Sequence, residues 1–291
     1  MLLLSPSPCT REIITAGIAE VHAATPDPND LVSGKGKIEL ERNGIKVYMG
    51  EWEEEARQIN EAYIKFVTTG LPFVTAKFAI SLDGKIATKG GDSKWISGDE
   101  ARRHVHYLRY ISDAIMVGAN TVLVDNPYLT CRLGGVGGRT RKQPLRVIVD
   151  GRGRTIPTAQ LFSEPGRTLL VTGRLAERGE KEGFIRAGAE VLELPSKEDG
   201  IDLKKLLKLL GEREVTSILV EGGGILLGSL FDHKLIDKVI TFVAPIIIGG
   251  EDAKTGVAGK GVDRVIDSIK LARVSTEKFG EDLMISGYIN N

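Results

Sequence analysis

Cysteine is nearly absent from this sequence: the 291 residues contain only Cys9 and Cys131. Two cysteines so far apart do not resemble the disulfide framework of a small secreted domain. Hydrophobic residues make up 42% of the chain and charged residues 27%. This is the balance of an ordinary globular protein.

The sequence also lacks an excess of charge of either sign, because Lys plus Arg and Asp plus Glu number 39 each. This balance argues against nucleic acid or an anionic membrane as a partner, although it leaves room for a local basic pocket. No apolar run approaches the ~18–20 residues that span a bilayer. Residues 1–4 are too short for a signal h-region and lack a basic n-region. We therefore expect a cytoplasmic enzyme or binding protein for a small molecule.

What the sequence does contain is an alternation of short β-branched apolar runs with amphipathic runs of helical period. This alternation is typical of an α/β fold with a mostly parallel central sheet flanked by helices. Strands are expected at 73–80, 114–118, 145–150, 168–172, 190–194, 217–221, 238–244 and 283–289. Helices are expected at 97–110, capped by Ser97 or Asp99, at 202–210 and at 226–233.

The chain is expected to divide into two domains, residues 1–72 and residues 73–291. In the first domain we expect helices at 11–19, 37–43 and 51–69, and strands at 21–24 and 45–49. About 70 residues are too few to bury a convincing core alone. In the second domain, residues 134–141 (GGVGGRTR) are predicted to form a flexible connector.

The most informative local pattern is a buried strand that leads into Gly222, Gly223 and Gly224 at the start of an apolar helix. Backbone N–H groups converge at such a turn and the helix dipole favours an anion, so the pattern predicts a phosphate site. It is not the dinucleotide fingerprint G-x-G-x-x-G, because the next glycine is Gly228, and it lacks the Lys-Ser/Thr of a P-loop. A tight strand-to-helix turn without a ligand accounts for the same residues.

Polar and aromatic residues in the first half of the second domain are expected to form a cleft. Lys77 interrupts an apolar strand, which is unfavourable unless its ammonium has a partner or faces a cleft. Arg109 and Arg132 come from separate segments, and converging arginines bind phosphate with fork geometry. Structural interpretations remain open: Lys77 can snorkel from an edge strand, Trp95 can be core, and Asp125 can belong to a turn.

Five ordered motifs resemble the reductase domain of the bifunctional riboflavin-biosynthesis deaminase–reductases. They are AKFAISLDGKIA at 76–87 with SKWI at 93–96, GANTVLVDNP at 118–127 with LTCR at 129–132, QPLRVIVD at 143–150, VEGG at 220–223, and AP at 244–245 with GG at 249–250. The resemblance extends from residue 73 to the C-terminus. It implies a dihydrofolate-reductase-like fold, NADPH as hydride donor, and reduction of a ribosylamino-pyrimidinone 5′-phosphate to its ribitylamino product.

The same resemblance implies roles for individual residues. The catalytic residues are expected to be Lys77, Glu221 and Asp125, with Lys77 donating a hydrogen bond or a proton to the opened ribose. Substrate binding is expected from Ser93, Arg109, Leu129, Arg132 and Glu221, the two arginines at the 5′-phosphate. Cofactor binding is expected from Ala79, Trp95, Thr121, Asp125, Gly151, Gly223, Gly224, Ile225, Leu226, Leu227, Gly228 and Ser229. Arg152 or Arg154 is the candidate for the 2′-phosphate of NADPH.

Residues 1–72 resemble only the end of the cytidine-deaminase-like domain of the same family. The matching segments are SPC at 7–9, ITAGI at 14–18 and DPN at 27–29, so Cys9 would correspond to the second zinc-binding cysteine. Zinc deamination needs three ligands, an open position for water and a glutamate. Because the family's His-Ala-Glu and first Pro-Cys have no counterpart in the chain, we expect no metal site and no deaminase activity. A docking or dimer-supporting role is expected for this remnant, in a homodimer or higher homo-oligomer.

Three other functions stay open at this point: a pterin or dihydrofolate-like reductase, a non-catalytic NADP-binding protein, and a zinc deaminase. Arg109 together with Arg132 favours a substrate that bears phosphate. Lys77, Asp125 and Glu221 together favour catalysis. The sequence does not distinguish a deaminated from a non-deaminated pyrimidine substrate.

Overall fold

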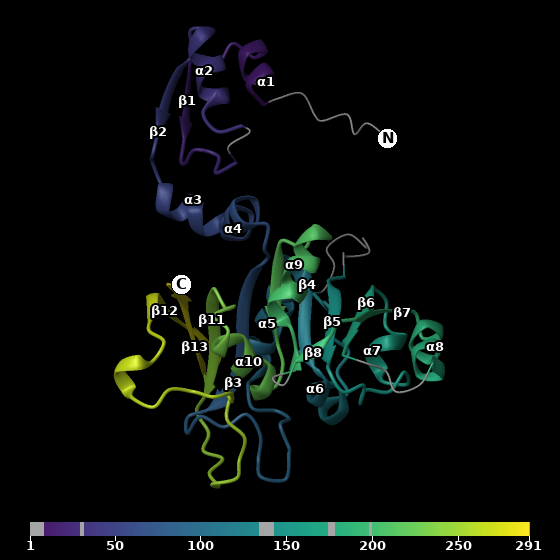
Figure 1. The fold of residues 1–291 in the computed structure, drawn as a ribbon. Helices are drawn as coiled ribbons and strands as arrows, with labels where there is room; N and C mark the ends of the chain where they lie inside the picture. Colours follow the sequence, from purple (N-terminus) through teal and green to yellow (C-terminus); the bar gives the residue numbers. More distant parts are fainter. Residues whose placement is uncertain (1–8, 30–31, 134–142, 174–177, 198–199, 291) are drawn as a thin grey trace. The chain divides into compact units, whose positions relative to one another are not determined.

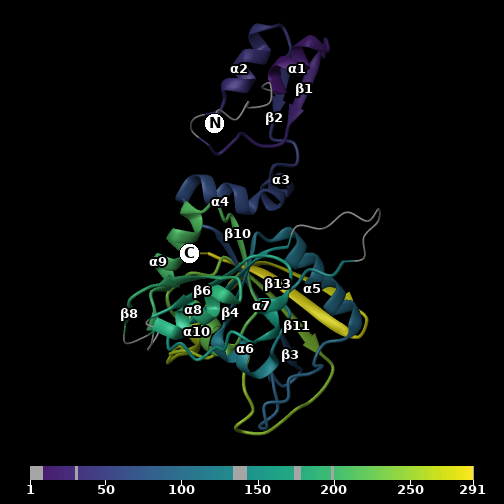
Figure 2. The same ribbon diagram turned by 90° about the vertical axis from the view of Figure 1, so that its right-hand side faces the viewer.

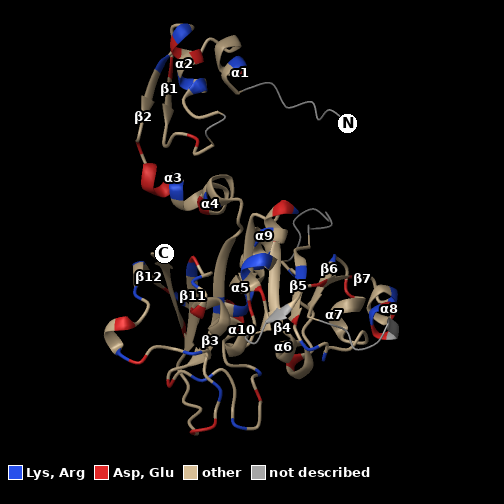
Figure 3. Cartoon of the chain, viewed as in Figure 1, with Lys and Arg blue, Asp and Glu red and all other residues tan. Residues whose placement is uncertain are grey.

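The computed structural model describes residues 9–29, 32–133, 143–173, 178–197 and 200–290. The chain divides into two compact units, Met1–Leu71 and Pro72–Asn291. Residues of both charges occur along the backbone of each unit (Figure 3). The predicted connector at 134–141 lies outside the described residues.

In the small unit, the described residues form a two-stranded parallel sheet and four helices. Its elements are α1 Cys9–Thr15, β1 Glu20–Ala23, α2 Lys35–Arg42, β2 Lys46–Met49, α3 Glu53–Ile59 and α4 Glu61–Thr69. Among the residues described in this unit, the buried hydrophobic side chains are Leu40 and Ile45, so it has little core. The prediction of one helix over 51–69 is wrong: Asn60, with φ −100° and ψ 15°, separates α3 from α4.

The large unit is built on a nine-stranded sheet in the order β12-β13-β11-β3-β10-β4-β5-β6-β7, which runs from left to right in Figure 1. All neighbours from β11 to β7 are parallel, whereas β13 is antiparallel to β11 and β12. The strands are β3 Phe73–Ser81, β4 Ala114–Gly118, β5 Leu145–Asp150, β6 Thr168–Thr172, β7 Ala189–Glu193, β10 Ser217–Val220, β11 Lys238–Ala244, β12 Leu271–Phe279 and β13 Asp282–Ile289. A separate hairpin joins β8 Ser196–Lys197 to β9 Gly200–Ile201. The predicted mostly parallel sheet is confirmed.

The central strands form where the sequence predicts them, because parallel strands are buried on both faces and read as continuous apolar runs. β4, β5, β6 and β11 have the predicted bounds. In β4, Ala114, Ile115, Met116 and Val117 are completely buried. The sequence does not predict β12, because its side chains are mostly exposed and show no alternation.

Helices cover both faces of the sheet. They are α5 Asp99–Ile111, α6 Ala119–Asp125, α7 Gln160–Ser163, α8 Arg178–Arg186, α9 Leu203–Glu212 and α10 Gly224–Asp232. The crossovers through α5, α6, α7 and α8 each move toward β7, whereas those through α9 and α10 move back toward β11. Parallel crossovers are right-handed, so the two groups lie on opposite faces. Figure 2 shows α5 and α9 on either side of the sheet.

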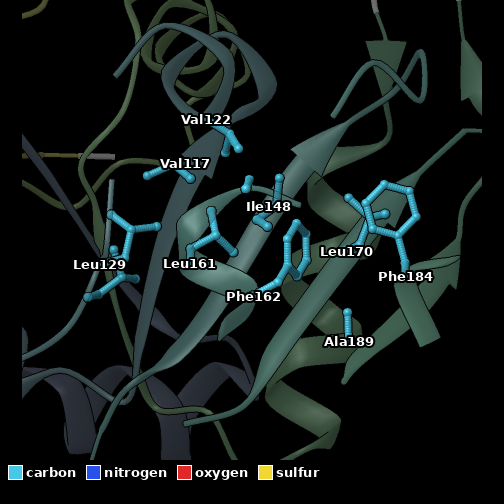
Figure 4. Packing of buried hydrophobic residues seen from close by; sticks show 11 residues of the cluster. Val117, Val122, Leu129, Ile148, Leu161, Phe162, Leu170, Phe184 and Ala189 are labelled. Atoms are coloured by element: carbon cyan, nitrogen blue, oxygen red, sulfur yellow. The ribbon is translucent and has the colours of Figure 1, made fainter. Parts of the chain in front are cut away.

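On the face of the sheet that α5 covers, the apolar side of this amphipathic helix forms part of the core. Ala101, Val105 and Leu108 lie about one turn apart and pack on Leu219 of β10 and Phe242 of β11. A second cluster fills the space around β4, β5 and β6 beneath α6, α7 and α8 (Figure 4). Together these contacts fix α5 and α6 relative to the strand ends that form the site.

The start of α5 differs from the prediction that Ser97 or Asp99 caps it. Gly98 is the N-cap residue, and no side chain of the cap position bonds to the helix. The Gly98 N–H instead donates to Asp282 Oδ2 over 2.7 Å. Asp282 stands 184 residues away in the sequence, so a local pattern cannot reveal this bond.

Candidate active site

A cavity of about 1000 Å³ lies at the carboxyl ends of the parallel strands of the large unit. Ligands of open α/β sheets bind at this edge, because the loops and helix N-termini that follow the strands converge there. The cavity is walled by residues of β3, β4, β5, α6 and α10, by the turn after β10 and by a loop at 251–256. The predicted site residues that line it are Lys77, Ala79, Ser93, Thr121, Asp125, Gly151, Glu221, Gly223, Gly224, Ile225, Leu226, Leu227 and Ser229.

The glycine turn between β10 and α10 forms one wall. Gly223 is the N-cap residue of α10 and has φ 58°, a conformation that favours glycine. A Cβ on Gly222 would lie 3.0 Å from both Thr121 Oγ1 and Val117 Cα, so glycine permits close packing with β4 and α6. No side chain caps α10, and the residues of its first turn line the cavity. Their N–H groups and the helix dipole suit an anion.

Gly228 lies at a close packing contact of α10. The segment at 255–259 crosses α10, and the Ala258 N–H donates to Gly224 O over 3.0 Å. A Cβ on Gly228 would collide with the Ala258 carbonyl, and Gly228 is absent from the described cavity wall. The contact of Gly228 with the cofactor stays a prediction.

Three charged side chains meet beside the cavity. Lys77 comes from β3, Glu221 directly follows β10, and Arg109 lies in the last turn of α5. Arg109 Nε donates to Glu221 Oε1 over 2.5 Å and Arg109 Nη2 donates to Oε2 over 3.0 Å. Lys77 Nζ lies 3.9 Å from Glu221 Oε2. The three side chains are at most 14% exposed, so water screens their charges only weakly.

Burial and mutual charge shift the pKa values of this cluster. Burial lowers the pKa of the Lys77 ammonium; the Glu221 carboxylate opposes that shift and the Arg109 guanidinium adds to it. Burial alone would raise the pKa of Glu221, but the charge and hydrogen bonds of Arg109, with Lys77, hold it below its ordinary value. Glu221 is thus ionised at neutral pH, and Lys77 gives up a proton more readily than an exposed lysine.

The structure brings Ser93 and Asp125 together. Ser93 was predicted to bind the substrate, and Asp125 was predicted to take part in catalysis and cofactor binding. Ser93 Oγ donates to Asp125 Oδ1 over 2.7 Å. Lys94 Nζ donates to the Asp125 backbone carbonyl over 3.3 Å. These bonds join the loop after β3 to the end of α6, and Ser93 and Asp125 both line the cavity.

Trp95, Leu129 and Arg132 do not line the described cavity wall. The Trp95 residue is 71% exposed, and the Arg102 guanidinium lies 4.6 Å from its ring centroid. Leu129 is 3% exposed and belongs to the hydrophobic cluster of Figure 4, where an apolar side chain is most stable. The Arg132 guanidinium lies 5.4 Å from the centroid of the Tyr128 ring. The cofactor contact of Trp95 and the substrate contacts of Leu129 and Arg132 stay predictions.

Arg109, which was predicted to bind the substrate phosphate, donates to three protein acceptors. Besides its two bonds to Glu221, it donates from Nη1 to the Thr130 carbonyl over 3.0 Å. Every nitrogen of the guanidinium therefore has a protein acceptor, and Arg109 is absent from the described cavity wall. The ion pair with Arg109 stabilises Glu221, because a buried carboxylate needs donors nearby.

Beside β5, two arginines line the cavity. Arg152 and Arg154 follow Gly151 in the loop after the strand. Asp150 Oδ2 accepts from the Thr155 N–H over 2.6 Å and from Thr155 Oγ1 over 2.8 Å, which fixes this loop. Two guanidinium groups at one end of the cavity suit a second anionic group.

The sequence did not predict the wall at 251–256. Asp83 anchors the chain just before this wall, because its carboxylate accepts from the N–H groups of Ile248 over 3.0 Å and Gly249 over 2.7 Å. The hydroxyl of Ser81 and these two N–H groups lower the pKa of Asp83 to about 2. The glycine pair at 249–250 was the signal in the sequence that pointed to this loop.

Elsewhere, Cys9 is exposed, Cys131 is buried, and both are free thiols. Among the residues that the structure describes, no group of three or more His, Cys, Asp and Glu could hold a metal ion. In the same part of the chain, no helix combines the length and apolarity required to cross a membrane.

A buried lysine–glutamate pair thus lies beside an uncapped helix N-terminus at the strand ends of a parallel sheet, where α/β enzymes bind their ligands. Residues 72–285 match the RibD C-terminal domain family. The riboflavin biosynthesis protein RibD of Actinobacillus pleuropneumoniae is 37% identical over 279 residues, which cover 96% of this chain and 73% of that protein. RibD of Aquifex aeolicus is 39% identical over 279 residues, which cover 96% of this chain and 75% of that protein. The chain therefore belongs to the RibD family of riboflavin biosynthesis, and its large unit is the reductase domain of that family.

Solved structures agree with this assignment. RibD of Acinetobacter baumannii (form 1) superposes with a TM-score of 0.84 at 31% identity, covering 98% of this chain and 76% of that chain. A deaminase/5-amino-6-(5-phosphoribosylamino)uracil reductase of Thermotoga maritima has a TM-score of 0.80 at 35% identity. The match covers 97% of this chain and 75% of that chain. The Saccharomyces reductase Rib7 shares the fold, with a TM-score of 0.60 at 21% identity over 81% of this chain and 100% of that chain. The predicted dihydrofolate-reductase-like fold is thus confirmed.

Proposed function

We propose that this protein uses NADPH to reduce the ribosyl side chain of a (di)amino-ribosylamino-pyrimidinone 5′-phosphate to ribityl. The observation that carries this proposal is the buried pair Lys77 and Glu221 on the cavity wall, next to the N-terminus of α10. The description of the Thermotoga maritima protein as a phosphoribosylaminouracil reductase supports the choice of substrate.

The cavity has the features that NADPH requires. The uncapped first turn of α10 offers backbone N–H groups to a pyrophosphate. Arg152 and Arg154 offer forked donors to the 2′-phosphate. Thr121 and Asp125 line the wall between them and suit the hydroxyls of a ribose. A volume of about 1000 Å³ is large enough for a second ligand beside a cofactor.

The reduction converts an imine-like C1′ of the opened ribose into an amine carbon, which requires a hydride on carbon and a proton on nitrogen. NADPH, when bound, supplies the hydride. The Lys77 ammonium supplies the proton or a hydrogen bond, because its lowered pKa makes it a competent acid. Glu221 stays ionised and, from 3.9 Å, holds that ammonium on the cavity wall. Asp125, fixed by Ser93, orients the ligands on the α6 side.

The small unit is proposed to support docking or dimer formation in a cytoplasmic homo-oligomer, without deaminase activity. Zinc deamination requires three ligands and a glutamate that shuttles protons. The 291 residues contain no His-Ala-Glu sequence, and Pro8-Cys9 is their one Pro-Cys pair.

The decisive assay incubates the purified chain and NADPH with either the deaminated or the non-deaminated ribosylaminopyrimidine phosphate. We expect NADPH oxidation when one of these pyrimidines is present, and a ribityl product by mass spectrometry. The same spectra should show no loss of an amino group from the non-deaminated pyrimidine. NADPH binding without turnover of either pyrimidine, or turnover of a dihydropterin instead, would contradict the proposal.

A further inference from the structure

Two loops of the large unit lie side by side beyond the carboxyl ends of β3 and β11 (Figure 1). The loop after β3 begins with a turn at 81–85, and the loop after β11 contains the cavity wall at 251–256. The turn is fixed from within, because the Ser81 hydroxyl donates to Asp83 Oδ1 over 2.6 Å and accepts from the Lys85 N–H over 2.9 Å. Ser81 is completely buried, so the base of the turn belongs to the core.

Asp83 fastens the second loop to this turn. Its carboxylate accepts from the N–H groups of Ile248 and Gly249, which lie just before the cavity wall. Beside this contact, the Leu82 N–H donates to the Ile246 carbonyl over 2.8 Å. Hydrogen bonds to an ionised carboxylate are stronger than those to a carbonyl, so Asp83 is the main link at this end of the loop.

The cavity wall is bonded to the loop after β3 at its other end as well. The Ile86 N–H donates to the Lys254 carbonyl over 2.8 Å, and Lys85 pairs with Thr255 in an isolated antiparallel bridge. The Lys85 ammonium also donates to the Ala253 carbonyl over 3.3 Å. Each loop therefore supports the other along the length of the wall.

Beyond the wall, the chain continues onto the first turn of α10. The Ala258 N–H donates to the Gly224 carbonyl over 3.0 Å, and a Cβ on Gly224 would lie only 2.9 Å from the Thr255 carbonyl oxygen. This first turn offers the N–H groups that are proposed to bind the pyrophosphate of NADPH. A displacement of the wall would therefore change both the shape of the cavity and the surroundings of these N–H groups.

We propose that Asp83 is a positioning residue for the cofactor, which acts by joining the turn at 81–85 to the segment at 246–256. Its carboxylate holds the wall against the N-terminus of α10 in the arrangement that binds NADPH. Asp83 itself is absent from the described cavity wall, so it acts through the backbone that it holds. A binding site that is already in place before the ligand arrives loses less free energy to ordering. The proposal rests on the proposed reductase function, although movement of the wall can be measured without any ligand.

Two variants of Asp83 remove different numbers of these bonds. Asp83→Ala removes every acceptor, whereas Asp83→Asn keeps Oδ1 for Ile248 and replaces Oδ2 by an amide group that cannot accept from Gly249. Asp263→Asn is the matched control, because Asp263 is exposed and lies outside the two bonded segments. The effects should be largest in Asp83→Ala and smaller in Asp83→Asn, and the control should match the wild type.

The first readout is amide hydrogen exchange of the ligand-free protein, followed by NMR. Loss of the Asp83 acceptor should speed exchange at Gly249 directly. Because the wall then loosens, exchange should also become faster at Ile86 and Ala258, whose N–H groups bond to the wall and to α10. A purely local role of Asp83 would leave these two amides at the wild-type rate.

The second readout is the affinity for the cofactor, measured by fluorescence titration. We expect Asp83→Ala to raise the Kd of NADPH about 10-fold, because hydrogen bonds to a charged group are lost. In steady-state assays the KM of NADPH should rise by a similar factor, whereas kcat and the KM of the pyrimidine should stay within about twofold of the wild type.

Any of three results would overturn the proposal. One is an unchanged Kd of NADPH in both Asp83 variants, and another is faster exchange that is confined to Ile248 and Gly249. The third is a lower kcat with equal rises in both KM values, which would show a general loss of structure. If thermal unfolding shows that Asp83→Ala is unfolded, Asp83→Asn decides. A wild-type chain that reduces neither pyrimidine would refute the proposed function, whereas the exchange rates and the Kd of NADPH would still decide the role of Asp83.

Discussion

Lys77 shows how the position of one residue in a sheet changes its chemistry. Its neighbours on β3 and β11 are apolar, and its Nζ lies 5.9 Å from the centroid of the Phe242 ring. Burial lowers the pKa of the ammonium, while Glu221 keeps it charged enough to bind and to donate. Because the shift is downward, the ammonium loses its proton at a lower pH than an exposed lysine does. The alkaline limb of the kcat profile should therefore begin below the ordinary range of lysine.

Lys77→Met tests this residue, because methionine preserves the length and the apolar contacts but has no proton to give. We expect kcat to fall about 100- to 10,000-fold, with an unchanged Kd for NADPH measured by fluorescence titration. Lys89→Met is the control, since the Lys89 side chain is 77% exposed. If Lys77→Met and the control reduced the pyrimidine equally fast, Lys77 would not be the proton donor.

Sequence reasoning found the residues of the site whose signal is local. Lys77 interrupts an apolar strand, which pointed to a cleft, and the family resemblance placed Glu221 at the substrate; both residues line the cavity. It could not foresee that Arg109 would pair with Glu221, which is 112 residues away. By resemblance it assigned Leu129 to the substrate; the structure places this leucine in a hydrophobic cluster, and its substrate contact stays a prediction. Partners set by tertiary packing have no local pattern.

At the scale of elements, the position of α10 places two demands on the residues of this helix. Its N-terminus has to face the cavity, and the segment at 255–259 has to pass directly over its backbone. Gly224 meets both demands, since a Cβ there would lie 2.9 Å from Thr255 O. Gly228, one turn further, meets only the second. Further along the helix, Leu226, Leu227 and Leu230 are buried.

Gly228→Ala should therefore lower stability rather than cofactor affinity. The new Cβ would collide with the Ala258 carbonyl, so the crossing segment would have to move, at a cost of about 1–3 kcal/mol. Urea unfolding of ligand-free protein measures this change. Gly183→Ala in α8 is the matched control, because its Cβ would meet Pro157 at an ordinary 3.5 Å. That variant should gain about 0.5–1 kcal/mol from its better helix propensity. A destabilised Gly183→Ala together with a neutral Gly228→Ala would contradict this account.

The elements differ in how far the sequence reveals them. β4 and β6 were predicted to the residue, because burial on both faces leaves an uninterrupted apolar run. The edge strand β12 is exposed along most of its length and carries no such run. The N-cap residue of α5 is a glycine whose N–H bonds to the distant Asp282, so nearby residues do not predict this cap.

At the scale of the whole molecule, the cavity belongs to one unit. Its described lining residues lie between Lys77 and Ala258, all within the unit Pro72–Asn291. The Saccharomyces reductase Rib7 matches over its full length while covering 81% of this chain. The fold that surrounds the cavity is therefore complete without the small unit, which has little core of its own.

A chain reduced to residues 72–291 should consequently fold and bind NADPH as the full chain does. We expect its circular dichroism to be that of an α/β protein, and its kcat and both KM values for reduction to lie within about twofold of those of the full chain, as for an independent domain. Light scattering of both proteins gives the second readout: if residues 1–71 support a dimer, the shorter chain should dissociate at a higher protein concentration. A folded fragment with no reductase activity at any concentration would show that the small unit contributes to the site. A fragment that regains activity as its concentration rises would show instead that the small unit acts through assembly alone.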